Sequence, residues 1–288
     1  MSAVARSGST AVEPLHDGGD GIVHKRAASR KLVHNQDMLA TTRKDFVLNR
    51  LKATGQIIAK ALSRELGVSE DTIRRDLREL AGAGLLQRVH GGALPSSPAM
   101  ANFAGRQQLA AAGKIAVGRT AARMIRPGQV VILDGGTTTA QIARHLPHDL
   151  RATIVTHSPT IAVALVEHPS IEVILLGGRL FKHSVVTVGA AAVEAVARIR
   201  ADLYFMGVTG IHPKAGLSTG DLEESHMKRA LMASAAETHV LASAEKVGTA
   251  SPYVICPLAD VDGLVVAPDI PKKTLAEYRK LGLSVVQA

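Results

Sequence analysis

Apolar and polar positions follow two different periods along the chain, and the change of period divides it into parts. Between residues 43 and 92 apolar positions recur at helical spacing, whereas beyond residue 129 short apolar runs alternate with helical segments. Residues 1–42 show neither period. The pattern therefore predicts a tail, a small helical unit and a larger α/β unit.

Residues 43–92 are predicted to form three helices and a hairpin. The first helix ends at Gly55, an extended piece covers residues 56–58, and the second helix covers residues 59–66. A turn that contains glycine leads to the third helix, and residues 85–92 then predict a strand and its turn. Two helices joined by such a turn form a helix-turn-helix, and the hairpin makes it winged.

The third helix has one face suited to burial and another suited to an anion. It begins at Ser69, whose hydroxyl is a good N-cap. Ile73, Leu77 and Leu80 form an apolar stripe at helical spacing. The polar residues off this stripe are Thr72, Arg74, Arg75 and Arg78. Arginines on a capped helix suit phosphates and guanine edges, although a solvated surface helix has the same pattern.

The distribution of charge favours the anion-binding alternative. The 288 residues carry a net charge of +9. Residues 43–95 hold 10 Lys and Arg against 6 Asp and Glu, and residues 96–288 hold 19 against 15, so the two parts have the same excess. A compact basic unit beside a nearly neutral larger one is typical of a nucleic-acid binder with a second function.

Composition excludes several other classes of protein. The sequence is 46% hydrophobic, enough for a sizeable core, and its single cysteine, Cys256, excludes an intramolecular disulfide and a cysteine metal site. No apolar run reaches the ~18 residues of a membrane span, and no secretion signal is recognised. We therefore expect a cytoplasmic protein without cofactor, metal or membrane, whose residues 1–42 form a disordered tail.

The chain after residue 93 predicts a linker followed by an α/β unit. Residues 93–98 have the composition of a linker, and a long helix over residues 107–125 connects the two domains. The predicted strands cover residues 130–133, 153–156, 171–176, 203–206, 240–242 and 264–266, and the helices between them cover residues 138–145, 159–167, 193–199 and 222–236. Apolar strands separated by helices predict a parallel sheet covered on both faces, with ligands bound at the carboxyl ends of its strands.

Polar turns follow four of the predicted strands. In the first, residues 134–139, two glycines, three threonines and a helix N-terminus form a candidate phosphate cradle, in which Asp134 is assigned to ligand hydroxyls. An ordinary strand-to-helix turn explains this spacing equally well. His157 is a turn residue rather than a metal ligand, and Lys246 is a candidate phosphate partner. The candidate binding residues are Asp134, Gly135, Gly136, Thr137, Thr138, Thr139, Thr156, His157, Ser158, Thr209 and Lys246.

Several sequence words in the small unit occur in order and in register. They are Leu66-Gly67-Val68-Ser69, Thr72-Ile73-Arg74-Arg75-Asp76-Leu77, Gly84-Leu85-Leu86 and Arg88-Val89-His90-Gly91-Gly92-Ala93. With these words residues 43–92 resemble the N-terminal domain of the DeoR family of bacterial transcriptional regulators. The resemblance implies binding to an operator in double-stranded DNA, with a recognition helix that begins at Ser69. In that arrangement base edges are contacted by Thr72, Arg74 and Arg75. Backbone phosphates of the DNA are contacted by Arg78, Arg88 and His90.

Residues 110–268 look like the sensor domain of the same family, which is related in fold to ribose-5-phosphate isomerase and binds phosphorylated sugars. The resemblance rests on Asp134-Gly135-Gly136-Thr137-Thr138, Gly177-Gly178-Arg179-Leu180, Gly216-Leu217-Ser218-Thr219, Glu223-Glu224 and Lys228-Arg229. The sequence departs from the family pattern at Gly135, His157, Thr209 and Ser243, where polar residues suited to hydroxyls change. The elements suited to phosphate remain, so we expect a phosphorylated effector other than a standard family sugar.

These observations predict a transcriptional regulator, most simply a repressor of a carbohydrate or polyol operon that acts as a dimer or tetramer. A phosphosugar isomerase is the alternative, with Asp134 as the obvious strand-end carboxylate and with Asp221, Glu223 and Glu245 as further candidates. The attached DNA-binding unit favours the regulator. An architectural DNA-binding protein leaves the clustered strand-end turns unexplained.

The predicted organisation has four parts. Residues 1–42 are the tail, residues 43–94 an α+β winged helix-turn-helix, and residues 95–106 a linker. Residues 107–288 form an α/β Rossmann-like domain, similar to ribose-5-phosphate isomerase, that binds the effector and forms the oligomer.

Overall fold

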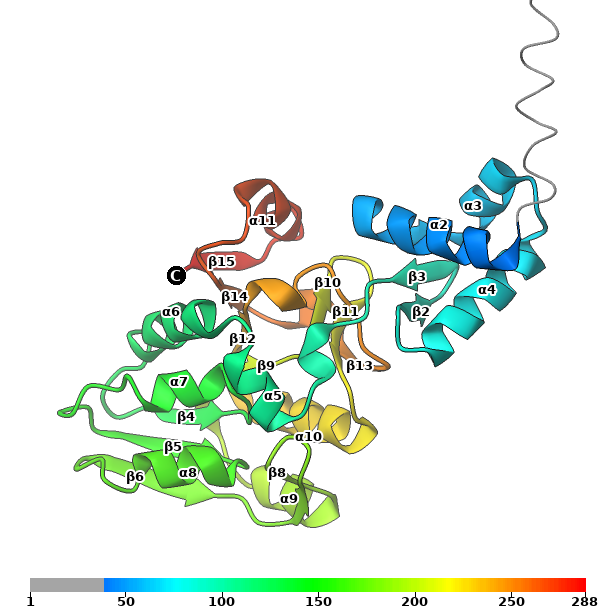
Figure 1. The fold of residues 1–288 in the computed structure, drawn as a ribbon. Helices are drawn as coiled ribbons and strands as arrows, with labels where there is room; N and C mark the ends of the chain where they lie inside the picture. The colour runs from blue at the N-terminus through cyan, green and yellow to red at the C-terminus, as the bar shows by residue number, and fades with distance from the viewer. Residues whose placement is uncertain (1–38) are drawn as a thin grey trace, which may run out of the picture.

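The computed structural model describes residues 39–288, so the predicted tail lies outside the described residues except at its end. There the prediction is wrong, because residues 40–42 already belong to the first described helix. The small unit consists of α2 (Ala40–Thr54), β1 (Ile57–Ile58), α3 (Ala59–Leu66), α4 (Glu70–Gly82), β2 (Gln87–Val89) and β3 (Gly92–Leu94) (Figure 1). This order confirms the winged helix-turn-helix.

The sheet of the wing includes β1, a strand that precedes α3 in the chain, as well as the hairpin of β2 and β3. Its three strands have the order β1-β3-β2, so β3 lies in the centre and Ala93 pairs with both Ile57 and Arg88. Residues 93–94, predicted as linker, are therefore part of the sheet. A side chain at Gly92 would lie 1.7 Å from the carbonyl oxygen of Ile57, which explains the glycine at this close approach.

The segment that joins the two domains is more folded than predicted. It contains the 3-10 turn η1 (Pro98–Met100), α5 (Phe103–Gln108) and α6 (Ala111–Ala122). The single helix predicted over residues 107–125 is wrong, because Ala110 has a left-handed backbone with φ 49° that ends α5 and redirects the chain. Residues in the predicted linker, Ser97 and Ala99 among them, are buried.

The larger domain is built on a parallel sheet of seven strands in the order β15-β14-β12-β9-β4-β5-β6. The strands are β4 (Val130–Leu133), β5 (Ala152–Thr156), β6 (Ile171–Leu175), β9 (Ala201–Gly207), β12 (Ala235–Ala242), β14 (Gly263–Val266) and β15 (Ser284–Gln287). Six of them correspond to predicted strands, and β15 was not predicted. The strand order reverses between β4 and β9, and ligands bind at such a point in open α/β sheets.

Helices cover both faces of this sheet (Figure 1). The remaining helices are α7 (Thr139–Ala143), α8 (Pro159–Leu165), α9 (Ala190–Val196), α10 (Leu222–Ala233) and α11 (Lys272–Arg279). The helices α6, α7 and α8 pack side by side, whereas α9 and α10 pack against each other on the other face. Val131, Ile132, Leu133 and Phe205 are fully buried between these layers.

All four helices predicted between the strands have different bounds in the structure, and those predicted over residues 138–145 and 159–167 are the shorter α7 and α8. The helix predicted over residues 222–236 ends at Ala233, because residues from Ala235 onward pair with β9. The helix predicted over residues 193–199 begins at Ala190 and ends at Val196. Pairing and packing override local helix propensity at these ends.

Several short elements at the carboxyl edge were not predicted. They are β7 (Arg179–Phe181), β8 (Val186–Val188), β10 (Gly210–His212), β11 (Gly216–Thr219), β13 (Tyr253–Cys256), and the 3-10 turns η2 (Ala244–Lys246) and η3 (Leu258–Asp260). The strands β7 and β8 form a hairpin, and β10, β11 and β13 form a small antiparallel sheet. Among residues 39–288, no helix has the length and apolar character needed to cross a bilayer.

Candidate functional site

The start of α4 has the geometry expected of a capped recognition helix. The hydroxyl of Ser69 accepts a hydrogen bond from the backbone N–H of Thr72 at 3.1 Å, and the two hydroxyls lie 2.9 Å apart. Glu70 and Asp71 occupy the first turn, where the helix dipole favours carboxylates. Ser69 is therefore the N-cap, and Thr72 is oriented by it.

The three predicted arginines of α4 differ in their surroundings. Arg74 donates to the carboxylates of Glu70 at 2.8 Å and Asp71 at 3.4 Å, so its guanidinium is held along its own helix. Arg75 and Arg78 are exposed beside it. The two wing residues predicted to bind DNA, Arg88 and His90, are exposed as well. The structure places all of these predicted residues on α4 and the wing of one small unit.

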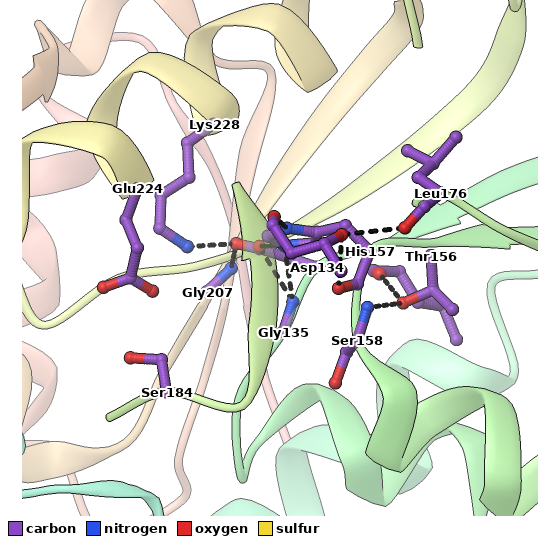
Figure 2. A network of polar contacts seen from close by, with 12 residues as sticks. Asp134, Gly135, Thr156, His157, Ser158, Leu176, Ser184, Gly207, Glu224 and Lys228 are labelled. Carbon is purple, nitrogen blue, oxygen red and sulfur yellow. Dashed lines mark hydrogen bonds and ion pairs between the residues drawn. The ribbon is translucent and has the colours of Figure 1, made fainter. Parts of the chain in front are cut away.

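Asp134, at the end of β4, organises the polar groups at the strand ends (Figure 2). Its Oδ1 accepts the backbone N–H of Gly135 at 2.8 Å and lies 2.8 Å from Nε2 of His157. Its Oδ2 accepts the backbone N–H of Gly207 at 2.7 Å and the ammonium of Lys228 at 2.5 Å. The side chain is fully buried and makes these contacts within the protein, so its contact with ligand hydroxyls stays a prediction.

The charge of Asp134 is held by its neighbours. Burial alone would raise the pKa of this carboxyl, but Lys228 and His157 outweigh burial and hold the pKa well below its usual range. Because Gly207 ends β9, the carboxylate also joins the two strands at which the sheet order reverses. Asp134 is therefore a charged structural anchor beneath the site.

The turn of Thr156, His157 and Ser158 supports this anchor and does not line a cavity. The three side chains are fully buried. The hydroxyl of Thr156 donates to the carbonyl of Leu133 at 2.7 Å, and Nδ1 of His157 lies 2.8 Å from the carbonyl of Thr187 in the β7–β8 hairpin. The structure therefore places these three residues in the network around Asp134, and their contact with the effector stays a prediction.

A small polar pocket of about 30 Å³ opens above Asp134 at the carboxyl ends of β4 and β9. Its walls come from the Gly135–Thr139 loop, from α10, from η2 and from the segment that joins the domains. The residues that line it are Ala99, Arg106, Lys114, Gly135, Gly136, Thr137, Thr138, Thr139, Ser184, Gly207, Val208, Thr209, Thr219, Glu224, Lys228 and Lys246. The structure therefore brings together the predicted Gly/Thr loop, Thr209 and Lys246.

Four basic side chains converge on this pocket: Arg106, Lys114, Lys228 and Lys246. The ammonium of Lys246 donates to the hydroxyl of Thr138 at 3.2 Å, and a terminal guanidinium nitrogen of Arg106 donates to the hydroxyl of Ser184 at 3.2 Å. Nε of Arg106 and the hydroxyl of Thr139 are buried without a hydrogen-bond partner. Buried polar groups are seldom left unpaired, so these two groups retain hydrogen-bonding capacity at residues that line the pocket.

Burial lowers the pKa of three of these basic side chains. Burial, opposed by Glu245 and aided by the charges of Lys114, Arg106 and Lys228, lowers the pKa of Lys246 to about 7. Burial also lowers the pKa of Lys114 and of Arg106. A cluster of cations that repel one another around unpaired donors binds an anion favourably.

One acid faces the pocket as well. Glu224 on α10 is only 6% exposed, and the hydroxyl of Thr219 lies 3.5 Å from its Oε2. A carboxylate accepts hydrogen bonds from ligand hydroxyls and repels phosphate. The pocket therefore has a cationic part and a part that accepts hydrogen bonds.

Sequence reasoning missed five of the functional side chains: Arg106, Lys114, Ser184, Glu224 and Lys228. Arg106 and Lys114 lie in what was predicted to be a linker and a connecting helix, and only the chain reversal at Ala110 brings both to the pocket. Glu224 and Lys228 were named only for their place in the sequence words that resemble the family. Their resemblance to the family words was the one signal that could have identified them.

Known proteins similar to this chain are regulators over most of its length. HTH-type transcriptional regulator GlpR of Haloferax volcanii is 34% identical over 251 residues, which cover 86% of this chain and 98% of that protein. The glycerol-3-phosphate regulon repressor of Escherichia coli is 30% identical over 212 residues, which cover 73% of this chain and 84% of that protein. Among solved structures, ribose 5-phosphate isomerase A of Methanocaldococcus jannaschii is 17% identical, covers 48% of this chain and 54% of its own, and has a TM-score of 0.36.

Two family descriptions match the two domains. Residues 43–98 match the DeoR-like helix-turn-helix domain, and residues 109–267 match the DeoR C terminal sensor domain. The sequence alone left two alternatives, a transcriptional regulator and a phosphosugar isomerase. Because the matching family consists of transcriptional regulators, the match supports the regulator. The chain therefore belongs to the DeoR family of transcriptional regulators, with a DNA-binding domain followed by a sensor domain.

Proposed function

We propose that this protein represses an operon of carbohydrate or polyol metabolism and leaves its operator when a phosphorylated small molecule binds the sensor pocket. The observation that carries the proposal is the cluster of Arg106, Lys114 and Lys246 around two buried, unpaired polar groups. The names of the relatives, a GlpR regulator and a glycerol-3-phosphate regulon repressor, supply the metabolic context.

The two parts of the pocket orient the proposed effector. Its phosphate lies at the Gly136–Thr139 loop, beside Lys246 and Arg106. Its hydroxyls lie toward Glu224 and Thr219, which offer acceptors. Phosphate beside Glu224 is disfavoured by like charge.

The DNA-binding part of the proposal places α4 in the major groove. Thr72, Arg74 and Arg75 then lie near base edges, and Arg78, Arg88 and His90 hold phosphates. Because one such unit makes few contacts, we infer that the protein acts as a dimer or tetramer through its sensor domain. Light scattering on the full chain, with and without operator DNA, measures that state, and a monomer on DNA contradicts it.

The test of the effector is a binding assay on DNA from upstream of the protein's own gene. Fluorescence anisotropy is followed while glycerol 3-phosphate and pentose, hexose and tetrose phosphates are added, each beside its unphosphorylated counterpart. We expect release with one or more phosphates and none with the counterparts. If only unphosphorylated compounds release the DNA, or stabilise the sensor domain in thermal unfolding, the phosphate assignment is wrong.

A further inference from the structure

The segment 95–106, here named the strap, runs from the wing to the sensor pocket and is fixed to the sensor domain along its length. The carbonyl of Pro95 accepts the backbone N–H of Ala250 at 3.2 Å. The hydroxyl of Ser97 donates to the carbonyl of Thr209, a residue of the pocket wall. Farther along, the backbone N–H of Phe103 donates to the carbonyl of His183 at 2.8 Å. The strap therefore forms one wall of the pocket.

The last residue of the strap, Arg106, turns its side chain into the pocket. Its guanidinium contacts Ser184, and its Nε is buried without a partner. The ammonium of Lys114 donates to the carbonyl of Arg106 at 2.6 Å and so fixes the end of α5 over the cavity. The left-handed backbone of Ala110, strained for a residue other than glycine, sets this geometry.

We propose that Arg106 is a ligand of the effector's phosphate, and that the strap transmits occupancy of the pocket to the wing. This inference rests on the proposed function, because it needs a phosphorylated effector. A guanidinium offers paired donors that match a phosphate, and the unpaired Nε supplies one of them.

The path from the strap to DNA is short. Leu94, at the end of the central wing strand β3, directly precedes the strap. Its neighbour Ala93 pairs with Arg88, the wing residue proposed to hold a DNA phosphate. A pull on the strap when Arg106 engages a phosphate therefore acts on the strand that positions Arg88. Ser97 is the fixed point between the two, because its hydrogen bond to Thr209 joins the strap to the pocket wall.

Calorimetry with inorganic phosphate and glycerol 3-phosphate tests the ligand role of Arg106. The variants are Arg106→Ala and Arg106→Lys, and the matched control is Arg119→Ala, an exposed arginine of α6. We expect Arg106→Ala to weaken binding of the phosphate compound at least about tenfold, Arg106→Lys to weaken it less, and the control to leave it unchanged. Operator affinity without ligand serves as the check of folding and stays at the wild-type value.

The coupling role is tested with Ser97→Ala in the full chain. We expect this variant to bind the phosphate compound within about twofold of the wild type, while the compound's effect on operator affinity falls at least about threefold. If Arg106→Ala binds as tightly as the wild type, or Ser97→Ala keeps full coupling, the inference is overturned and the proposed function stands. If the wild type binds no phosphate compound at all, the proposed function and the inference fail together.

Discussion

At the scale of single residues, the two carboxylate oxygens of Asp134 connect the strand ends and side chains of the site. The neighbouring Gly135 leaves space for this arrangement. A Cβ at Gly135 would lie 2.0 Å from Cγ1 of Val186 and 3.6 Å from Nε2 of His157. The glycine therefore lets the β7–β8 hairpin close over His157. Two of the departures from the family pattern, at Gly135 and His157, are thus parts of one packed network.

Replacing Gly135 by alanine tests that packing. Because the added methyl overlaps Val186, we expect Gly135→Ala to lower the free energy of unfolding of the sensor domain by about 1–3 kcal/mol. Urea denaturation measures the change. The second substitution Val186→Ala is expected to restore part of the loss, as a double-mutant cycle shows. Gly177→Ala, where a Cβ meets nothing within 4 Å, is the control, and an equal loss there would refute the explanation.

If Lys246 contacts the effector's phosphate, as proposed, effector binding depends on pH. In the empty pocket its pKa is lowered to about 7, and a bound phosphate dianion raises it again, so binding takes up a proton above pH 7. The ligand's own second pKa, near 6, keeps its charge constant in that range. We expect the affinity to fall between pH 7 and pH 9, by at most about tenfold per unit.

Calorimetry in two buffers of different ionisation enthalpy measures this proton uptake. Lys246→Met is expected to bind weakly and to lose most of the pH dependence, which separates its contribution from that of Lys114. A wild-type affinity that stays constant between pH 7 and pH 9 would show that Lys246 is not in contact with the phosphate.

Arg75 is the arginine of α4 best placed to read a base, since Arg74 is held by Glu70 and Asp71. We expect Arg75→Ala to weaken operator binding by about 1–3 kcal/mol and to affect scrambled DNA less. Anisotropy on both duplexes measures the difference. Arg64→Ala, an exposed arginine of α3, is the control. Equal weakening on both duplexes would assign Arg75 to the DNA backbone instead.

At the scale of elements, the small domain is held by a buried ion pair as well as by its apolar core. The guanidinium of Arg43 on α2 donates to both carboxylate oxygens of Asp76 on α4, at 2.5 and 3.0 Å. Both side chains are buried, and the pair raises the pKa of Arg43. The recognition helix therefore presents its outer face at an orientation that α2 helps to set.

Breaking this pair destabilises the DNA-binding domain. Asp76→Asn leaves Arg43 buried beside a neutral partner, so we expect a loss of about 2–3 kcal/mol in the free energy of unfolding. Chemical denaturation followed by circular dichroism measures it. Glu79→Gln is the matched control, because Glu79 pairs with Lys44 at the surface, and little change is expected there. A loss of equal size in both variants would contradict a special role for the buried pair.

An element could be predicted where the local sequence determines it, and could not be predicted where contacts with distant residues determine it. The strand Val130–Leu133 was predicted because it is apolar on both faces and bounded by turns. The helix Ala59–Leu66 was predicted to its exact ends because Gly67 stops it with a left-handed backbone. The break at Ala110 gave no local signal, since alanine favours a helix. The pocket residues of the strap depend on that break, so they could not be predicted.

At the scale of the whole molecule, the sheet order determines where the pocket lies, and the strap connects the wall of this pocket to the wing of the DNA-binding domain. The reversal between β4 and β9 opens the pocket, and the buried anchor Asp134 fixes its floor. The Gly/Thr loop was predicted because its chemistry is local, whereas Arg106 lines the pocket because of the path that the chain takes after β3. Figure 1 shows this path from β3 to α5. The connecting segment therefore contributes Ala99 and Arg106 to the wall of the pocket.

Coupling between two sites is reciprocal, which gives the last prediction. If glycerol 3-phosphate or another effector weakens operator binding by a given factor, operator DNA must weaken effector binding by the same factor. Calorimetry of the effector with the free protein and with the protein saturated by operator duplex measures this factor, with a scrambled duplex as control. In Ser97→Ala we expect both factors to move toward one together, because this substitution removes the fixed point between pocket and wing. Factors that differ between the two directions, and that vary with protein concentration, would place the coupling in subunit association instead of in the strap.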